Sequence, residues 1–283
     1  MQIPTVFFLS ILAGLSLVQG QCSDAGVCSI GSASTYPAEN TVKIDAGYSY
    51  GIGSTVEDVD FHTVYLKGTF LLSQTGLLFI RWNVLNRQIG PLGTVSGIGD
   101  LLLIYKQILW ERAGSVFSLS AGLKLATGNA NANPDLPQVY QPGLGTNDLL
   151  FGLNYQINTW QFLLGYQYTQ RIRNANKVNR LKRGDDLYAE LAYTGDMMGG
   201  QVIFKLMGIK RLQESEISDG SGGFVIVDGS AQTQVNAAAN YTYRLSHGYA
   251  VSAEAALPIL KRKINVDGLT RYFTFSVQIS KNL

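Results

Sequence analysis

The sequence predicts an all-β fold, a transmembrane antiparallel up-and-down β-barrel of about 12 strands with short periplasmic turns and long outer loops. From Thr41 to the C-terminus, stretches of about ten residues alternate apolar and polar side chains, as strands with one apolar and one polar face do. Short and long connectors alternate between these stretches. After residue 20, no apolar run approaches the roughly 20 residues of a membrane helix.

Residues 1–20 are expected to be a signal peptide that is removed on export. An apolar run, Val6 to Val18, is followed by small residues that suit cleavage after Gly20. No Lys or Arg precedes this run, so only the amino terminus supplies positive charge. A buried N-terminal helix is the less favoured alternative, because the run is too short to span a bilayer and the barrel pattern begins only after it.

Residues 21–40 are expected to form a periplasmic N-terminal segment that carries both cysteines of the chain, Cys22 and Cys28. In an exported protein, such a pair favours a small disulfide loop. A redox or metal-binding pair is a weaker alternative, because no His lies nearby to complete a ligand set. Lipid attachment at Cys22 is a third, although Gln21 stands where a small residue is usual.

The barrel is expected to occupy residues 41–283, and its first strand, Val42 to Ile52, shows the pattern clearly. Its even-numbered residues are apolar or aromatic, and its odd-numbered residues are charged or small. One stretch, Leu101 to Tyr105, is apolar throughout and leaves open which of its faces meets lipid. The further strands are expected at about 62–73, 77–85, 100–110, 116–126, 147–156, 160–170, 186–194, 201–211, 233–243, 249–259 and 271–283.

The connector lengths predict how the barrel sits in the outer membrane of a Gram-negative bacterium. Such barrels have short periplasmic turns and longer outer loops, and the first connector, 53–61, is already long. Both termini are therefore expected on the periplasmic side. Tyr and Trp residues lie toward the strand ends, where interfacial girdles form. A soluble β-sandwich is the alternative, but it would not need every second connector to be short.

Charge and composition narrow the expected partners. The formal net charge of +2 is too close to neutral to indicate a nucleic-acid partner. The expected partners are outer-membrane lipids and lipopolysaccharide, a small-molecule solute, and the barrel-assembly machinery, which would read the final strand ending in Leu283. The chain is expected to be a monomer.

The histidines do not indicate an enzyme. His62 is expected to face outward at the outer rim without a serine at a useful offset, and His247 falls in a predicted short turn. There is no HExxH motif and no Cys/His cluster. We therefore expect no catalytic residues, no cofactor and no metal site.

The candidate site is the inner wall of the predicted barrel, where charges of both signs alternate inward. These charges favour a polar channel for small solutes. The alternative is a narrow barrel filled by its own salt-bridge network. The long connector 127–146 contains three prolines and is a candidate constriction. The lumen-lining candidates are Arg81, Lys124, Asp148, Asp186, Glu190, Lys205, Glu254 and Arg271.

Two further connectors carry charge. The stretch Arg171 to Arg183 is basic and contains no acid; we expect it to contact lipopolysaccharide phosphates or solvent, or to steer anionic solutes. The acidic connector 213–219 is a candidate partner for it.

The middle of the chain resembles a known family. Three pieces carry the resemblance: Gly97 to Leu101 (GIGDL), Ser120 to Gly128 (SAGLKLATG) and Gln141 to Leu149 (QPGLGTNDL). In this order they resemble the outer-membrane β-barrel family catalogued under the MetA pathway of phenol degradation, whose members are often called transporters. Members of the family usually have Pro where Ala126 stands. The resemblance covers about 97–170 and implies a barrel that passes small compounds, aromatic ones among them.

Taken together, the sequence favours a porin-like outer-membrane channel or facilitator for small molecules, aromatic or hydrophobic ones among them, by passive permeation. A non-conducting structural or adhesive barrel that binds a partner through its outer loops is the alternative. An outer-membrane lipid hydrolase is the third. Lys124 and Asp148 are expected to face inward on adjacent strands, beside the connector 127–146, as a lumen pair.

Overall fold

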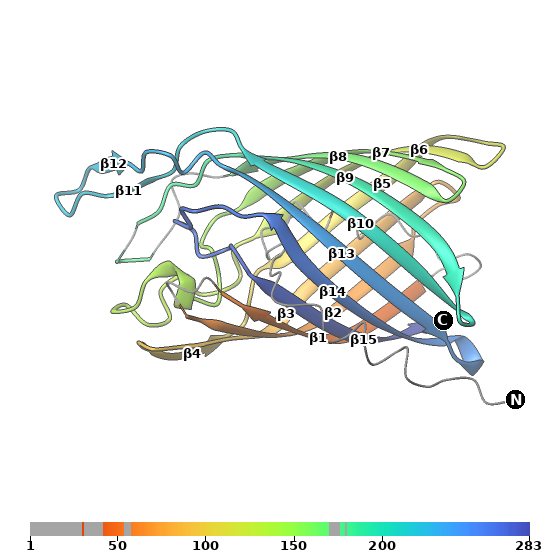
Figure 1. The fold of residues 1–283 in the computed structure, drawn as a ribbon, viewed down its shortest axis with the longest axis horizontal. Helices are drawn as coiled ribbons and strands as arrows, with labels where there is room; N and C mark the ends of the chain where they lie inside the picture. Colours follow the sequence, from red (N-terminus) through yellow and green to blue (C-terminus); the bar gives the residue numbers. More distant parts are fainter. Residues whose placement is uncertain (1–29, 31–41, 54–57, 170–175, 179) are drawn as a thin grey trace, which may run out of the picture.

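The computed structural model describes residues 30, 42–53, 58–169, 176–178 and 180–283, and it shows a closed antiparallel β-barrel (Figure 1). The main sheet has 13 strands, of which β4 (Gly93–Gly97) pairs with β3 alone, so twelve strands form the wall in the described part of the chain. The predicted fold class is therefore confirmed. The wall strands are β1 (Val42–Ile52), β2 (Asp60–Leu71), β3 (Gly76–Gly90), β5 (Leu101–Arg112), β6 (Ser115–Leu125), β7 (Asp148–Ile157), β8 (Trp160–Thr169), β9 (Asp186–Met197), β10 (Gly200–Arg211), β13 (Thr233–Arg244), β14 (Tyr249–Leu260) and β15 (Phe273–Asn282).

The barrel closes because the first and last strands pair with each other. On β1, Tyr48 lies opposite Val277 of β15 on one side and opposite Val64 of β2 on the other. Every wall strand therefore has two neighbours, and the described wall leaves no row of unpaired backbone groups facing lipid.

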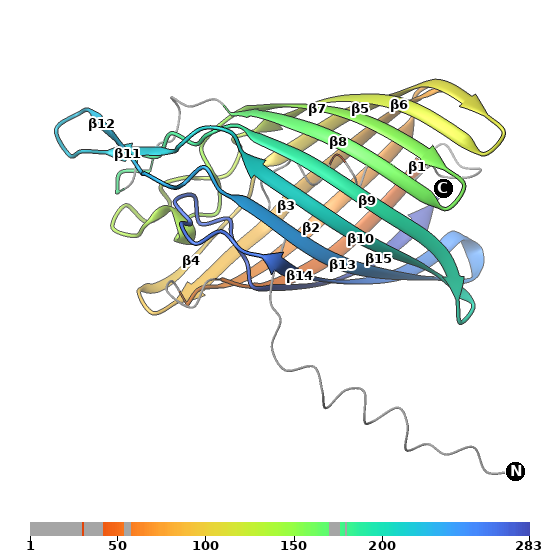
Figure 2. The ribbon, with the colours of Figure 1, turned by 45° about the horizontal axis from the view of Figure 1, so that its top comes forward.

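The two ends of the barrel differ (Figures 1 and 2). The long connectors gather at one end, here called the long-loop end, together with the small hairpin of β11 (Glu216–Ser218) and β12 (Phe224–Ile226). The tight turns and the C-terminus lie at the other, the short-turn end. The predicted alternation of long and short connectors is thus confirmed.

The alternation in sequence becomes an alternation in burial. Along β7, Asp148, Leu150, Gly152 and Asn154 are buried, and the residues between them are exposed and apolar. In a closed barrel the buried set points inward and the exposed set points outward. The outer surface is accordingly apolar, as a surface facing lipid must be.

Some segments differ from the sequence prediction. The sequence prediction ends one strand at about residue 85 and begins the next at about residue 100, yet β3 continues to Gly90 and pairs with β4. Gly93 makes this hairpin possible because its backbone has a φ of 137°, a value that residues other than glycine rarely adopt. The connector 212–232 likewise contains the β11–β12 hairpin.

The structure also shows which face of the apolar stretch Leu101 to Tyr105 in β5 points inward. Leu102 and Ile104 are fully buried inside the barrel, whereas Tyr105 is exposed on the outer face. The stretch is apolar throughout because both faces of this strand contact apolar surroundings.

The described helices are two short 3₁₀ turns, Gln138–Tyr140 and Ser246–Gly248. Among the described residues, none of the helices has the length and hydropathy needed to cross a membrane. The expected signal peptide, Cys22, Cys28, Arg171 and Arg173 lie outside the described residues.

Candidate functional site

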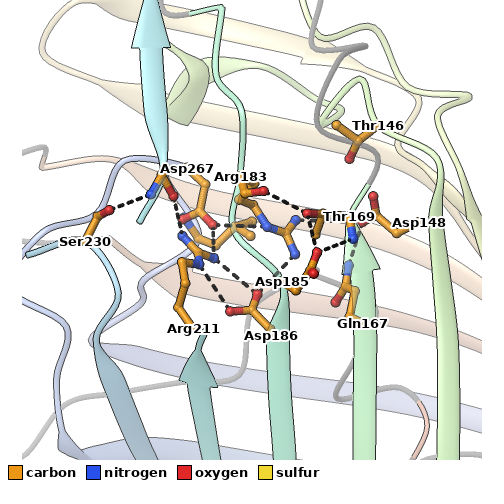
Figure 3. Close-up of polar contacts among 12 residues, drawn as sticks. Thr146, Asp148, Gln167, Thr169, Arg183, Asp185, Asp186, Arg211, Ser230 and Asp267 are labelled. Carbon is orange, nitrogen blue, oxygen red and sulfur yellow. Dashed lines mark hydrogen bonds and ion pairs between the residues drawn. The ribbon is translucent and has the colours of Figure 1, made fainter. Parts of the chain in front are cut away.

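A buried cluster of charges lies inside the barrel at its long-loop end (Figure 3). Asp186, the first residue of β9, contacts the guanidinium groups of Arg183, Arg211 and Arg262, each at 3.2 Å. Asp267 lies 2.6 Å from Arg211 and 3.5 Å from the Nε atom of Arg183. These five residues, here called the Asp186 cluster, tie the loops 176–185 and 261–272 to strands β9 and β10.

A second ionic group adjoins the Asp186 cluster. The Lys124 ammonium lies 3.3 Å from Asp148 on the neighbouring strand β7 and 3.3 Å from Asp100. Arg183 approaches Asp148 at 3.8 Å, which links the two groups. Lys124 and Asp148 are thus paired across adjacent strands, as the sequence led us to expect.

Asp100 joins the three sequence pieces that carry the family resemblance. Its carboxylate accepts hydrogen bonds from the backbone N–H of Gly128 at 3.0 Å and of Leu144 at 3.2 Å. Gly128 and Gly143 pack so closely that a Cβ added to Gly143 would lie 2.6 Å from the Gly128 carbonyl oxygen. These motifs therefore have a structural role: they hold the connector 126–147 against the barrel wall.

This connector folds into the long-loop end. Its short helix, Gln138–Tyr140, is fully buried, and Asn86 of β3 donates a hydrogen bond of 2.8 Å to the Pro142 carbonyl. Beneath it lies a cavity of about 50 Å³, large enough for a few water molecules. Its lining includes Arg81, Lys124, Asp267 and Arg271, with Phe61 and Leu102 as apolar members.

Further along the barrel, more charged side chains lie inside the wall. The Lys205 ammonium of β10 lies 2.9 Å from Glu254 of β14, and Tyr188 donates a hydrogen bond to Glu190. Lys67 of β2 donates a hydrogen bond of 2.9 Å to Gln278 of β15. The Arg81 guanidinium lies 4.7 Å from the centre of the Tyr65 ring.

Apolar residues also face the interior, next to some of these charges, and this was not predicted: Met207 pairs with Glu190, and Ala238 pairs with Lys205, on neighbouring strands. These apolar residues, here called the apolar patch, point inward and are almost fully buried. A signal was present in the sequence, because these strands carry apolar residues on both faces, as in Leu149-Leu150-Phe151 and Phe162-Leu163-Leu164. The patch consists of Ile30, Phe79, Leu102, Ile104, Leu150, Leu163, Tyr188, Met207, Ile209, Ala238 and Ala256.

The remaining predictions have mixed outcomes. Arg271 is buried with its guanidinium 3.1 Å from the centre of the Phe61 ring. The expected pairing of the basic and acidic connectors occurs between Lys182 and Glu216, at 2.9 Å. The expectation of a solvated or lipid-contacting basic connector is wrong for Arg183, which is buried because Asp148, Asp186 and Asp267 surround it.

Neither histidine lies in a catalytic arrangement within the described residues. The Nδ1 atom of His62 lies 2.6 Å from the Tyr48 hydroxyl, on the outer face of β1 and β2. His247 lies exposed in the β13–β14 turn with a φ of 58°. Among the described residues, no group of three or more His, Cys, Asp or Glu is placed to hold a metal ion.

The electrostatics of the cluster can be followed at Asp267, which lies in the loop 261–272. Burial alone would raise the pKa of its carboxyl, but Arg211, Arg183 and Arg262 outweigh that effect and hold the pKa well below its ordinary value of 3.8. Because the pKa is lower in the folded protein, the charge on Asp267 stabilises the fold at every pH above the unfolded value.

We therefore expect the difference in free energy of unfolding between the wild type and Asp267→Asn to stay constant from pH 8 to pH 5. It should shrink only below the unfolded pKa of 3.8 and vanish as the pH falls through the folded value. Urea titrations of the folded protein at each pH would measure it. A difference already halved at pH 5 would contradict the assigned pKa direction.

The closed wall, the apolar outer surface and the charged interior define the class: a transmembrane β-barrel of the outer-membrane type. No protein-family profile and no curated protein matches the sequence. Among solved structures, the chain is similar to the COG4313 outer membrane channel from Pseudomonas putida F1, with a TM-score of 0.64 and 14% identity over 89% of this chain and 98% of that one. It is also similar to the CymD monoaromatic hydrocarbon channel, with a TM-score of 0.50 and 10% identity over 95% and 98%. At these identities the similarity concerns the fold alone.

Proposed function

We propose that this chain is an outer-membrane channel or facilitator through which small molecules, especially aromatic or hydrophobic ones, permeate passively. The observation that carries the proposal is the inward-facing apolar patch, whose wall residues lie on β3, β5, β7–β10, β13 and β14. An interior facing only water is polar, and apolar area left in water costs about 25 cal/mol per Å². An apolar surface inside the barrel is therefore suited to an apolar guest.

The charged residues of the interior complement this patch. Lys67, Lys205 and Glu254 supply polar partners inside the same barrel as apolar residues such as Leu150 and Leu163. A small solute with a ring and one polar group could contact both kinds of residue at once. The predicted lumen-lining residues take this role in the proposal, and the connector 126–147 is the proposed constriction above them.

The proposed orientation places the long loops outside the cell and both termini in the periplasm, with lipopolysaccharide around the long-loop end. The chain would act as a monomer, since its wall is closed by its own strands. The resemblance of the Asp100 region to the MetA-pathway family supports the same function, because all three motif pieces hold the proposed constriction.

Proteoliposome uptake tests the proposal with two solutes that cross lipid slowly, benzenesulfonate and xylose. We expect uptake that needs no energy source and favours the aromatic solute. Met207→Gln, on the apolar patch, should lower the preference by about two- to thirtyfold, because a polar amide in place of an apolar side chain costs an apolar guest about 0.5–2 kcal/mol. Met197→Gln, exposed at the short-turn end, is the matched control and should leave the preference unchanged.

The outcomes separate the candidate functions. Liposomes that take up neither solute, together with a purified protein that shows no conductance in planar bilayers, would favour the non-conducting barrel. Equal uptake of both solutes by the wild type and by Met207→Gln would retain a channel but exclude the aromatic preference.

A further inference from the structure

Two glycines form a notch in the inner wall of the barrel. Gly152 of β7 and Gly165 of β8 lie directly opposite each other in the strand register, and both face inward. Neither has a positive φ, so their backbone conformations are open to any residue. Glycine weakens a strand interior and often marks a place where another group approaches closely. Because neither residue has a side chain, the pair leaves room on the inner wall for another group.

The space is occupied by a residue from outside the wall. Ile30, which precedes β1 in the chain, is 2% exposed and belongs to the apolar patch. Its Cδ1 atom would lie 3.2 Å from a Cβ added to Gly165. Its Cγ2 atom would lie even closer to a Cβ added to Gly152, closer than real Cβ atoms come to their neighbours. The notch thus fits one branched alkyl side chain.

The walls of the notch are mainly apolar. Tyr188 pairs with Gly165 on β9, Ser120 pairs with Gly152 on β6, and Leu150 and Leu163 lie two residues away on the same inward face. Empty cavities with apolar linings stay dry and can bind ring-sized hydrocarbons. The chemistry of the notch is therefore that of an apolar binding site.

We propose that the Gly152–Gly165 notch is a binding site for one small apolar group, such as a benzene ring, and that the Ile30 side chain occupies it in place of a solute. This inference rests on the proposed function in placing the notch on the solute's route. An apolar solute and Ile30 would then exclude each other, and the resting protein would hold its own site closed.

A double-mutant cycle tests whether Ile30 occupies the notch. Ile30→Ala removes the two atoms that reach the glycines, and Gly152→Ala adds a Cβ that would collide with one of them, the Cγ2 atom. We expect Gly152→Ala to lower the unfolding temperature of the wild type, read from heat-modifiable gel mobility, and to lower that of Ile30→Ala less. Gly208→Ala is the control, because nothing lies within 4 Å of a Cβ added there, and it should show no coupling to Ile30.

Equal effects of Gly152→Ala in the two backgrounds, whether large or absent, would overturn the occupancy. Toluene tests the ligand class: it should raise the unfolding temperature of Ile30→Ala and not that of Ile30→Ala/Gly152→Leu, in which a leucine refills the notch. The same toluene shift in both variants would overturn the site. Failure of the channel function would look different, since the cycle would still show coupling while neither the wild type nor Ile30→Ala conducts.

Discussion

Replacing Asp186 with alanine is expected to lower the free energy of unfolding by about 3–5 kcal/mol, the usual cost of removing one member of a buried ion pair. Asp186 is 1% exposed and contacts Arg183, Arg211 and Arg262, each at 3.2 Å. Removal of the carboxylate leaves three guanidinium groups close together with Asp267 as their main remaining acid. Their repulsion should also release the loop 261–272, which carries Arg262 and Asp267.

Urea unfolding of the barrel, followed by tryptophan fluorescence, would measure this loss. Glu216→Ala is the matched control, because it breaks a partly exposed pair with Lys182 whose worth is about 0–1 kcal/mol. Equal losses in Asp186→Ala and Glu216→Ala would show that the Asp186 cluster is hydrated well enough to tolerate the missing acid.

The wall of this protein could be predicted almost completely from its sequence, because its periodicity is local. Each strand has to present apolar side chains to lipid at every second position. The inward and outward faces of β1 and β7 can therefore be predicted from the residues of each strand alone. The prediction failed where pairing rather than alternation decides the structure. The β3–β4 hairpin extends beyond the wall and lacks a lipid-facing side to impose a pattern.

The interior was predictable only in part, for the same reason. Parity alone placed Lys124 and Asp148 inward, because both lie on wall strands, and the observed register sets them opposite each other. Arg183, Arg262 and Asp267 lie in connectors, and their burial depends on contacts between residues far apart in sequence. The apolar patch could have been predicted from β5 and β8, because both strands contain runs with apolar residues on both faces. The prediction missed it because the lumen was expected to be polar.

A charge placed on the outer face should be tolerated or rejected according to its depth, which tests the assignment of that face to lipid. Leu164 lies in the middle of β8, 54% exposed and pointing away from the lumen. Leu164→Arg is expected to cost about 2–4 kcal/mol of folding free energy in lipid bilayers, as Arg does near the midplane of such barrels. Met198→Arg, in the short turn after β9, should cost about 0–1 kcal/mol because the turn lies near water. If the two variants unfolded alike, the outer face of β8 would not lie in the hydrocarbon core, and the position of the barrel in the membrane would have to be reassigned.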